Sequence, residues 1–464
     1  MQLANSLNIS DKKIIGSMMA FGLGFAGLAF LLGLDGINGL ILIGICIAFL
    51  MTYVLVKYER FWIYSLMGIS PIFFYGSKAG ISPNDVFMSL YLNVFTFIWL
   101  IYIIFIKKER IVHSISDWLM LMFYFFSLLT VVNSLNNDIP FINFIKEYAL
   151  FSTCLIYFPL KYYIKDKKDI INLLIILTIA LTFADLYHFY LYKSTALQDV
   201  LYAYQLGTSV RINQTIFTTA AFTGLIFTIY AKSIKARLII LSFSAITTFA
   251  LVVTFSRTFW LILIVLVAIA FVLLPIKRKR ILTTLILIVV TLSLSVTFLV
   301  FKDNAKIFLK VAENRITSVE KGSKDESVKA RLVEYESVYR DIERYPLSGM
   351  GLGTKVRVYD YFKFTTSYIA NIHNSYLFIM HRWGIPLGII FLFIMFYNAY
   401  FSLVGIFKMK DDFYKILSYS AFAAFFTLIV ASTTSAQFFQ RDSQFVIAIA
   451  MLFVNKINEQ KSWI

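Results

Sequence analysis

Charged residues are scarce in this chain. Of its 464 residues, 15% are charged and 59% are hydrophobic, and the mean hydropathy is +0.76. A soluble domain carries about 25% charged residues, so this composition excludes that class. Cysteine is scarcer still: Cys46 and Cys154 both lie in apolar runs, which argues against disulfides and cysteine-ligated metals. Only four histidines occur, and two of them lie in one segment, Asn371–Gly388.

Long apolar runs take the place of the missing charges. Runs of about 20 residues recur almost end to end, and each is long enough to cross the hydrocarbon core of a bilayer. A helix satisfies its own backbone hydrogen bonds there, so the sequence predicts one all-α, polytopic membrane domain over residues 1–464, with 12 to 14 transmembrane helices. The first run, Ile14 to Leu34, is too long for a signal peptide. The predicted spans are 14–34, 37–56, 61–76, 86–106, 118–133, 147–160, 170–191, 215–231, 238–255, 258–275, 281–301, 384–407, 415–434 and 442–455.

The net charge of +17 is explained by the orientation of these spans. With the N-terminus inside, the short inner loops hold 23 basic residues and the short outer loops hold 6. This asymmetry follows the positive-inside rule, and it predicts that both termini are cytoplasmic. The excess of basic residues therefore gives no reason to expect a nucleic-acid partner.

One predicted outer loop is far longer than an ordinary connection. It covers residues 302–372, and the region 302–383 is expected to carry part of a site. Within it, residues 326–345 predict an amphipathic helix that ends before Pro346. The apolar face of that helix is predicted to hold Leu332, Tyr335, Val338, Tyr339 and Ile342.

Several polar residues fall at the predicted outer face, where the positive-inside rule disfavours basic groups. Arg211, Arg257, His373 and Arg382 all lie there. The same face receives Asp185, His188 and Arg441. Each one taken alone has a plain alternative, a side chain that snorkels to the interface. A group of them at one face favours function, whereas an ion-coupled transporter would carry such groups near the bilayer midplane.

Arginines at a membrane surface suit phosphate ligands, because the guanidinium fork matches phosphate oxygens and keeps its charge. A lipid diphosphate presents phosphates at this depth, with a polyprenyl tail among the helices. A sugar on such a diphosphate is already activated, so catalysis needs positive charge for the leaving group. A neutral histidine suits the removal of the acceptor proton. The long loop shows no acidic metal-binding pair, which predicts no metal and no cofactor.

Three motifs in this order resemble the O-antigen ligase and polymerase superfamily (WaaL-like and Wzy-like proteins). They are "SRTFW" at 256–260, "ARLVEYESVYRDIERYPLSGMGLGT" at 330–354, and "IHNSYLFIMHRWGIPLG" at 372–388. The resemblance covers residues 200–400 by motif and the whole chain by topology. It implies a GT-C-like, metal-independent glycosyltransferase of the bacterial inner membrane. The implied active site lies on the periplasmic face, and the implied donor is undecaprenyl-diphosphate-linked glycan.

The resemblance also implies roles for individual residues. Arg257 and Arg331 resemble essential arginines, His373 resembles an essential histidine, and Arg211 resembles a further external arginine. Arg211 and Arg257 would bind the diphosphate, Arg331 would help to bind it or the acceptor, and His373 would orient or deprotonate the acceptor hydroxyl. Asn374 is a further candidate for substrate binding, and either Asn374 or Ser375 is expected to cap the helix that follows.

The pair His381–Arg382 departs from the usual family pattern, in which a small or acidic residue precedes Trp-Gly. These two residues are predicted either to contact the acceptor or to line the rim of the site. His373 has the alternative of a polar cap, and Arg331 that of a surface pair with Glu334. "GMGLGT" lies in no βαβ unit, so its glycines predict a tight turn packed on the membrane face rather than a dinucleotide site.

Three classes of function remain open. The first is a transferase, either a polymerase that adds repeat units or a ligase that moves glycan onto lipid A-core, and the chain length favours the polymerase. The second is a lipid-linked oligosaccharide flippase, which predicts charged cavities through the bundle and internal repeats. The third is a non-catalytic assembly partner. The expected partners are the lipid-linked donor, a glycan or lipid A-core acceptor, membrane lipid and a polysaccharide chain-length regulator.

Overall fold

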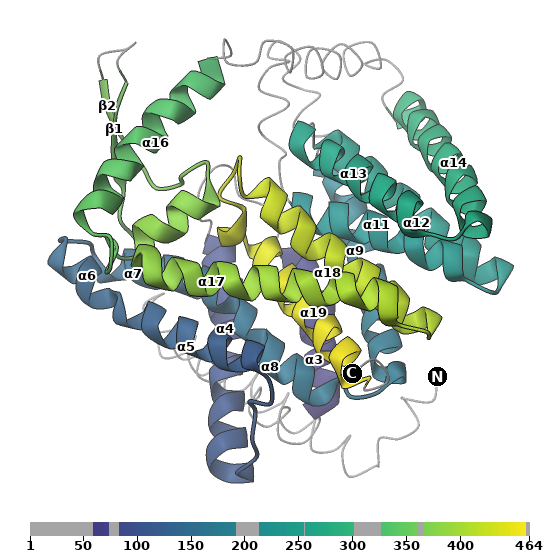
Figure 1. The fold of residues 1–464 in the computed structure, drawn as a ribbon, viewed down its shortest axis with the longest axis horizontal. Helices are drawn as coiled ribbons and strands as arrows, with labels where there is room; N and C mark the ends of the chain where they lie inside the picture. Colours follow the sequence, from purple (N-terminus) through teal and green to yellow (C-terminus); the bar gives the residue numbers. More distant parts are fainter. Residues whose placement is uncertain are drawn as a thin grey trace, which may run out of the picture.

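The computed structural model describes residues 59–73, 83–191, 213–254, 256–300, 326–360 and 365–460. In these ranges the protein is a helical bundle with one two-stranded hairpin, which confirms the predicted all-α membrane class (Figure 1). The helices are α3 (Glu59–Phe73), α4 (Pro83–Ile101), η1 (Tyr102–Lys107), α5 (Ile115–Leu129), α6 (Val131–Asn136), α7 (Phe141–Ser152), η2 (Thr153–Ile156), α8 (Tyr157–Tyr163), α9 (Lys167–Leu191), α11 (Gln214–Tyr230), α12 (Ile234–Val253), α13 (Arg257–Leu273), α14 (Ile276–Val300), α16 (Glu326–Arg344), α17 (Ser375–Lys408), α18 (Asp412–Ala431), η6 (Gln437–Phe439) and α19 (Arg441–Glu459).

The predicted spans in the described ranges coincide with helices. Six are long and apolar enough to cross a membrane: Ile115–Asn136, Phe141–Tyr163, Lys167–Tyr190, Ile234–Val253, Ser375–Lys408 and Asp412–Ala431. Three further apolar helices are shorter: Tyr91–Lys107, Gln214–Tyr230 and Arg257–Leu273. The first two predicted spans lie outside the described residues, so the total of 12 to 14 stays a prediction.

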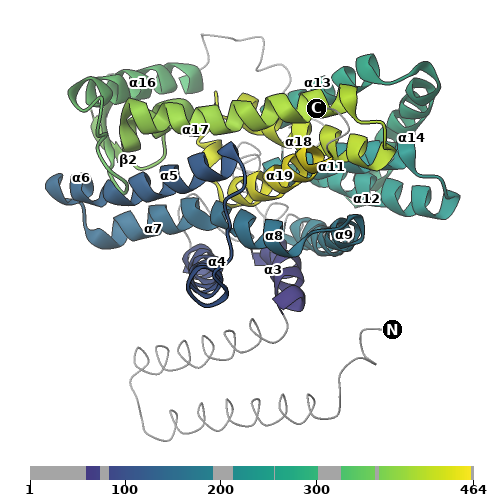
Figure 2. The ribbon, with the colours of Figure 1, turned by 60° about the horizontal axis from the view of Figure 1, so that its bottom comes forward.

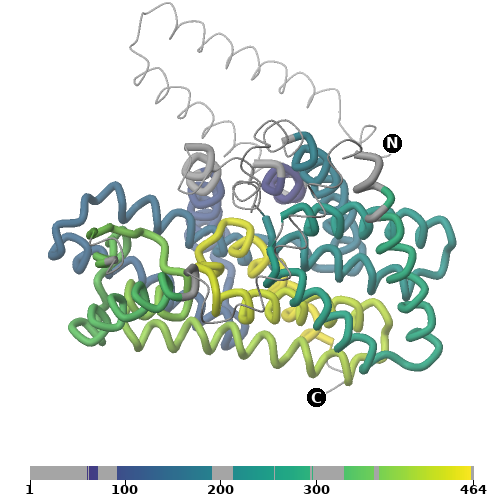
Figure 3. The backbone as a smooth tube through the Cα atoms, turned by 90° about the horizontal axis from the view of Figure 1, so that it is seen from above, coloured from purple at the N-terminus to yellow at the C-terminus, as the bar shows by residue number. Residues whose placement is uncertain are grey.

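Helix α18 lies at the centre of the bundle, where it packs against α11, α17 and α19. Helix α17 runs along α5, while α3 packs on α9, and α3 and α4 lie on the far side of the bundle from α17 (Figure 2). Figure 3 shows the C-terminal helices between α11–α14 at one end and the α16 region at the other. The ends of α11, α13, α17, α18 and α19 therefore come close enough to build a site.

The long loop folds into helix α16 and an antiparallel hairpin of β1 (Val356–Asp360) and β2 (Thr365–Ile369). The predicted helix end is confirmed, because α16 stops at Arg344, two residues before Pro346. Helix, hairpin and the start of α17 share a small hydrophobic core of their own. Its buried members are Val338, Ile342, Val356, Val358, Ile372, Leu377 and Phe378.

The predicted apolar face of α16 is wrong in part. Val338 and Ile342 are buried as predicted, whereas Leu332 and Tyr339 are 59% and 55% exposed. The buried face also includes Glu334, which is 6% exposed. The buried face of α16 is therefore rotated relative to the predicted one. A pattern of apolar residues does not predict this difference, because it assigns the position of the Glu334 carboxylate to solvent.

The Gly-Ile-Pro sequence at 384–386 predicts a break before the next span, and helix α17 breaks there. Gly384 has non-helical torsions (φ 77°, ψ 170°), and Pro386 follows it. The turn after α16 docks here through the backbone: Met350 N–H donates to the His381 carbonyl at 2.7 Å, and Ile385 N–H to the Pro346 carbonyl at 2.7 Å. A Cβ on Gly384 would lie 2.3 Å from the Leu347 carbonyl oxygen, so only glycine fits this contact.

Candidate active site

His373 lies between strand β2 and helix α17, with 53% of its side chain exposed. Its ring Nδ1 is 2.8 Å from Oε2 of Glu334, and its backbone N–H donates to Oε1 of the same carboxylate at 2.5 Å. The Tyr335 hydroxyl donates to the His373 carbonyl at 3.0 Å. Burial raises the pKa of Tyr335, and the nearby charge of Arg331 opposes this shift. Two consecutive residues of α16 thus hold His373 at three points.

The two residues after His373 anchor the start of α17. The side-chain oxygen of Asn374 accepts from Tyr376 N–H at 2.9 Å and Leu377 N–H at 3.2 Å, so Asn374 caps this helix. Ser375 N–H donates to the Ser432 carbonyl at 2.9 Å. The Ser375 hydroxyl donates to the Ser435 carbonyl at 2.8 Å. His373 is therefore fixed on one side by α16 and on the other by the end of α18.

The connection from α18 to α19 carries a cluster of polar side chains, here called the polar junction. Gln437 Nε2 donates to Thr215 Oγ1 at 2.6 Å and to Ser443 Oγ at 3.1 Å, which joins α11 to α19. Thr258 Oγ1 lies 3.4 Å from Thr434 Oγ1, which joins α13 to the same connection. The polar junction consists of Thr215, Thr258, Ser375, Thr434, Ser435, Gln437 and Ser443. It gathers the ends of five helices beside His373.

The predicted arginines stand in different relations to this junction. Arg257 is the first residue of α13, half-buried, and directly precedes Thr258 of the polar junction. Arg331 lies on α16 one turn before Tyr335, also half-buried. The structure therefore places these two near the elements that hold His373. Arg211 lies outside the described residues, which resume at Asn213.

His381 and Arg382 are fully buried. Arg382 Nε is 3.2 Å from Glu147 Oε2, and its Nη1 is 3.0 Å from His381 Nδ1. His381 Nε2 is 3.1 Å from Asp341 Oδ2 on α16, and Glu147 also accepts from Gly353 N–H at 2.7 Å. These contacts tie α7, α16, α17 and the glycine turn together. Both side chains are buried and engaged by charged groups of α7 and α16, which supports a structural role for this pair.

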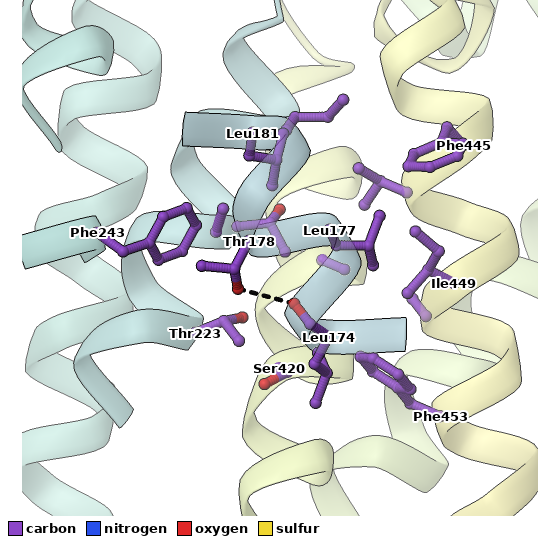
Figure 4. A pocket seen from close by; sticks show the side chains of 16 residues that line it. Leu174, Leu177, Thr178, Leu181, Thr223, Phe243, Ser420, Phe445, Ile449 and Phe453 are labelled. Atoms are coloured by element: carbon purple, nitrogen blue, oxygen red, sulfur yellow. Dashed lines mark hydrogen bonds between the residues drawn. The ribbon is translucent and has the colours of Figure 1, made fainter. Parts of the chain in front are cut away.

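An apolar pocket opens within the bundle close to the polar junction (Figure 4). It has a cavity volume of about 100 Å³ and lies between helices α9, α11, α12, α18 and α19. Ile216 and Phe445 line it, and each follows directly after a polar residue at its helix start, Thr215 and Gln444. The Thr178 hydroxyl at the pocket donates to its own helix, to the Leu174 carbonyl at 2.8 Å. The pocket wall therefore presents almost only hydrocarbon.

Fold and site define a class: a multi-pass helical membrane protein whose polar junction lies at one end of an apolar bundle. Residues 241–392 match the family model described as O-antigen ligase. This match supports membership of the O-antigen ligase and polymerase superfamily, and it covers Arg257, Arg331, His373 and the His381–Arg382 pair. No curated protein matches the chain.

Sequence reasoning did not predict the contacts that three acidic residues make in the site region. Glu147, Glu334 and Asp341 each contact a basic residue or a histidine of the α17 segment. A usable signal was present for two of them, because Glu334 and Asp341 are seven residues apart and therefore lie on one face of a helix. Glu147 gave no such signal, since its partner lies more than 200 residues away.

Proposed function

We propose that this protein is a glycosyltransferase that takes glycan from undecaprenyl diphosphate at the periplasmic face of the bacterial inner membrane. The observation that carries the proposal is an exposed imidazole, His373, fixed where five helix ends meet next to an apolar pocket. A lipid-linked sugar needs these surroundings, because its reacting carbon lies at the membrane surface while its tail lies among the helices.

The reaction divides between the arginines and the histidine. The acceptor hydroxyl attacks the anomeric carbon, the bond from that carbon to the diphosphate oxygen breaks, and His373 takes the hydroxyl proton. Arg257 and Arg211 bind the diphosphate and neutralise its growing charge, and Arg331 assists with the diphosphate or the acceptor. The leaving group is already good, so this route needs no metal.

The apolar pocket suits the isoprenoid tail of the donor. Burial of each CH2 group in such a pocket contributes about 0.8 kcal/mol, and the lining offers little competing polar surface. A flippase, by contrast, needs charged cavities along the path of its glycan. The hydrocarbon lining of this pocket therefore supports a site for the tail and gives no support to a path for sugars.

The acceptor separates two forms of this activity. The leading form is a polymerase that moves the growing chain onto the next lipid-linked repeat unit. The second form is a ligase that moves glycan onto lipid A-core, the activity that the description of the matching family names. Purified protein is given undecaprenyl-diphosphate-linked oligosaccharide with and without lipid A-core. A ladder on the carrier lipid indicates the polymerase, and product only with the core acceptor indicates the ligase.

A matched pair of variants tests the transferase itself. His373→Ala is expected to abolish product while the protein stays in the membrane. His113→Ala is the control, since His113 is exposed and lies before α5, away from the polar junction. A non-catalytic assembly partner would instead tolerate His373→Ala. Full activity of this variant would therefore contradict the proposal. If the protein moves glycolipid across vesicle bilayers and forms no glycan product, the flippase function replaces the transferase.

A further inference from the structure

We propose that Glu334 is the positioning residue of His373: it holds the imidazole with its proton on Nδ1 and leaves the lone pair of Nε2 for the acceptor. This inference rests on the proposed function for its consequence on catalysis, and it makes a claim about one tautomer that is measured independently of any reaction.

The tautomer follows from the hydrogen bonds of the carboxylate. Both oxygens of Glu334 are engaged by His373, Oε1 by the backbone N–H and Oε2 by ring Nδ1. An ionised carboxylate only accepts hydrogen bonds, so Nδ1 must carry the proton. In a neutral ring the lone pair then lies on Nε2, which is the nitrogen that a general base uses. Within the described residues, no hydrogen bond occupies Nε2.

A comparison inside the same segment separates this arrangement from a purely structural one. His381 uses both ring nitrogens: Asp341 lies at Nε2, and Arg382, which is only a donor, lies at Nδ1. Its ring is fully buried. His381 therefore has the opposite tautomer and no free lone pair, whereas His373 has one nitrogen held and a ring that is half exposed.

Because Glu334 is buried, its contact with His373 fixes the orientation of the imidazole. Its side chain is 8% exposed, and it reaches His373 across 39 residues of sequence. The backbone bond from His373 N–H alone would be enough to attach this segment to α16. The second bond, to the ring, fixes the orientation of the imidazole and so adds something that attachment does not require.

The contact that Asp341 makes with His381 fixes the position of α16, and with it the position of Glu334 opposite His373. Asp341 lies two helical turns beyond Glu334 on the same face, and it contacts His381 as Glu334 contacts His373. Sliding or rotating α16 would break both contacts together. The buried Asp341–His381–Arg382–Glu147 network thus holds Glu334 at the height of His373.

The proton is accounted for at each stage. His373 Nε2 takes the proton of the acceptor hydroxyl as the new glycosidic bond forms and the bond to the diphosphate oxygen breaks. The resulting imidazolium has its positive charge beside the Glu334 carboxylate, which stabilises it. The exposed ring then returns the proton to solvent, and the lipid diphosphate leaves with the electron pair of the broken bond.

Three variants of one helix test the proposal by kinetics. Glu334→Gln keeps the shape and removes the charge, and the transferase is expected to lose about 10²- to 10⁴-fold in kcat with KM unchanged, the range that a general base contributes. Glu334→Asp keeps a carboxylate and is expected to retain more activity than Gln. Glu336→Gln removes the same charge from an exposed position two residues along and is expected to keep the wild-type kcat. Equal rates for Glu334→Gln and Glu336→Gln would overturn the proposal.

A tautomer measurement makes the test independent of the reaction. Nitrogen-15 NMR of histidine-labelled protein in lipid distinguishes protonated from bare ring nitrogens, and four histidines are few enough to assign with single variants. The wild type is expected to show His373 protonated at Nδ1. In Glu334→Gln the amide oxygen keeps the backbone N–H and the NH2 turns to Nδ1, so the proton is expected to move to Nε2.

The two readouts separate the two ideas. If the wild type makes no product from lipid-linked donor but shows the Nδ1 proton and its shift in Glu334→Gln, the transferase fails and the positioning role stands. If product forms and depends on His373, yet the tautomer is the same in Glu334→Gln as in the wild type, the positioning role is overturned and the transferase stands.

Discussion

Glu334 and Asp341 lie on one face of α16, and each contacts a histidine of the segment that leads into the kink of α17. The two pairs have opposite surroundings. The Glu334–His373 pair reaches solvent through a half-exposed ring, whereas the Asp341–His381 pair is closed off by Arg382. One helix of the long loop therefore supplies both the partner of the half-exposed His373 ring and the attachment that keeps this ring in place.

Arg382→Ala is expected to lower the free energy of unfolding by about 3–5 kcal/mol, because removal of one partner leaves Glu147 without its buried counter-charge. Thermal unfolding in detergent measures the change. Arg344→Ala removes an arginine from the exposed end of α16 and is expected to change the stability by less than about 0.5 kcal/mol. A small effect for Arg382→Ala would mean that the buried network does not hold the loop.

Gly384→Ala is expected to cost at least about 1–2 kcal/mol, since its positive φ is unfavourable for any residue with a Cβ. The added Cβ would also strike the Leu347 carbonyl. Gly388→Ala on the same helix is the control, because its nearest contact is a side-chain methyl of Ile379 at 3.2 Å. Faster proteolysis of the α16 region in Gly384→Ala alone is the expected second sign, and equal stability of the two variants would contradict the role of the turn.

Arg257→Ala is expected to lower kcat by about 10²- to 10³-fold, the loss seen when one group that stabilises transition-state charge is removed. Arg257→Lys keeps the charge without the planar fork and should lie between Ala and the wild type. Arg280→Ala, exposed on α14, is the matched control. Rates are measured with lipid-linked donor in detergent, and a wild-type rate for Arg257→Ala would remove this residue from the site.

Ala424→Phe narrows the apolar pocket from α18, where Ala424 is 2% exposed. It is expected to raise KM for a long-tailed donor about tenfold or more, because displacing a few CH2 groups forfeits about 0.8 kcal/mol for each. A donor with a short isoprenoid tail serves as the control, since it need not enter the pocket. Equal effects on both donors would mean general damage to the bundle rather than a blocked tail site.

The sequence predicts the helices well because the membrane allows few alternatives. Every predicted span in the described ranges coincides with a helix, and the break at Gly384 lies where Gly-Ile-Pro predicts it. These features depend on local composition and on the length of apolar runs. The hairpin Val356–Ile369 was not predicted, because its short strands carry no alternation strong enough to separate them from loop.

The candidate site was only half predictable for a related reason. His373 and Arg257 were found as polar residues in apolar surroundings, which is a signal that one chain carries by itself. The burial of Glu334 follows instead from a contact 39 residues away, and hydrophobic patterning assigned Leu332 and Tyr339 of α16 to the interior although both are exposed. His381 and Arg382 resembled surface groups in the sequence, and only the packing of α7 and α16 over them shows that they are interior.

The glycine turn meets α17 through main-chain atoms on both sides, at the His381, Arg382 and Pro346 carbonyls. Side chains take little part in this docking: Leu347 in the turn is 76% exposed, and Tyr368 on the hairpin is 64% exposed. Exchange of such residues therefore leaves the register of α16 unchanged. The outward surface of the loop can change in sequence without a change in the geometry around His373.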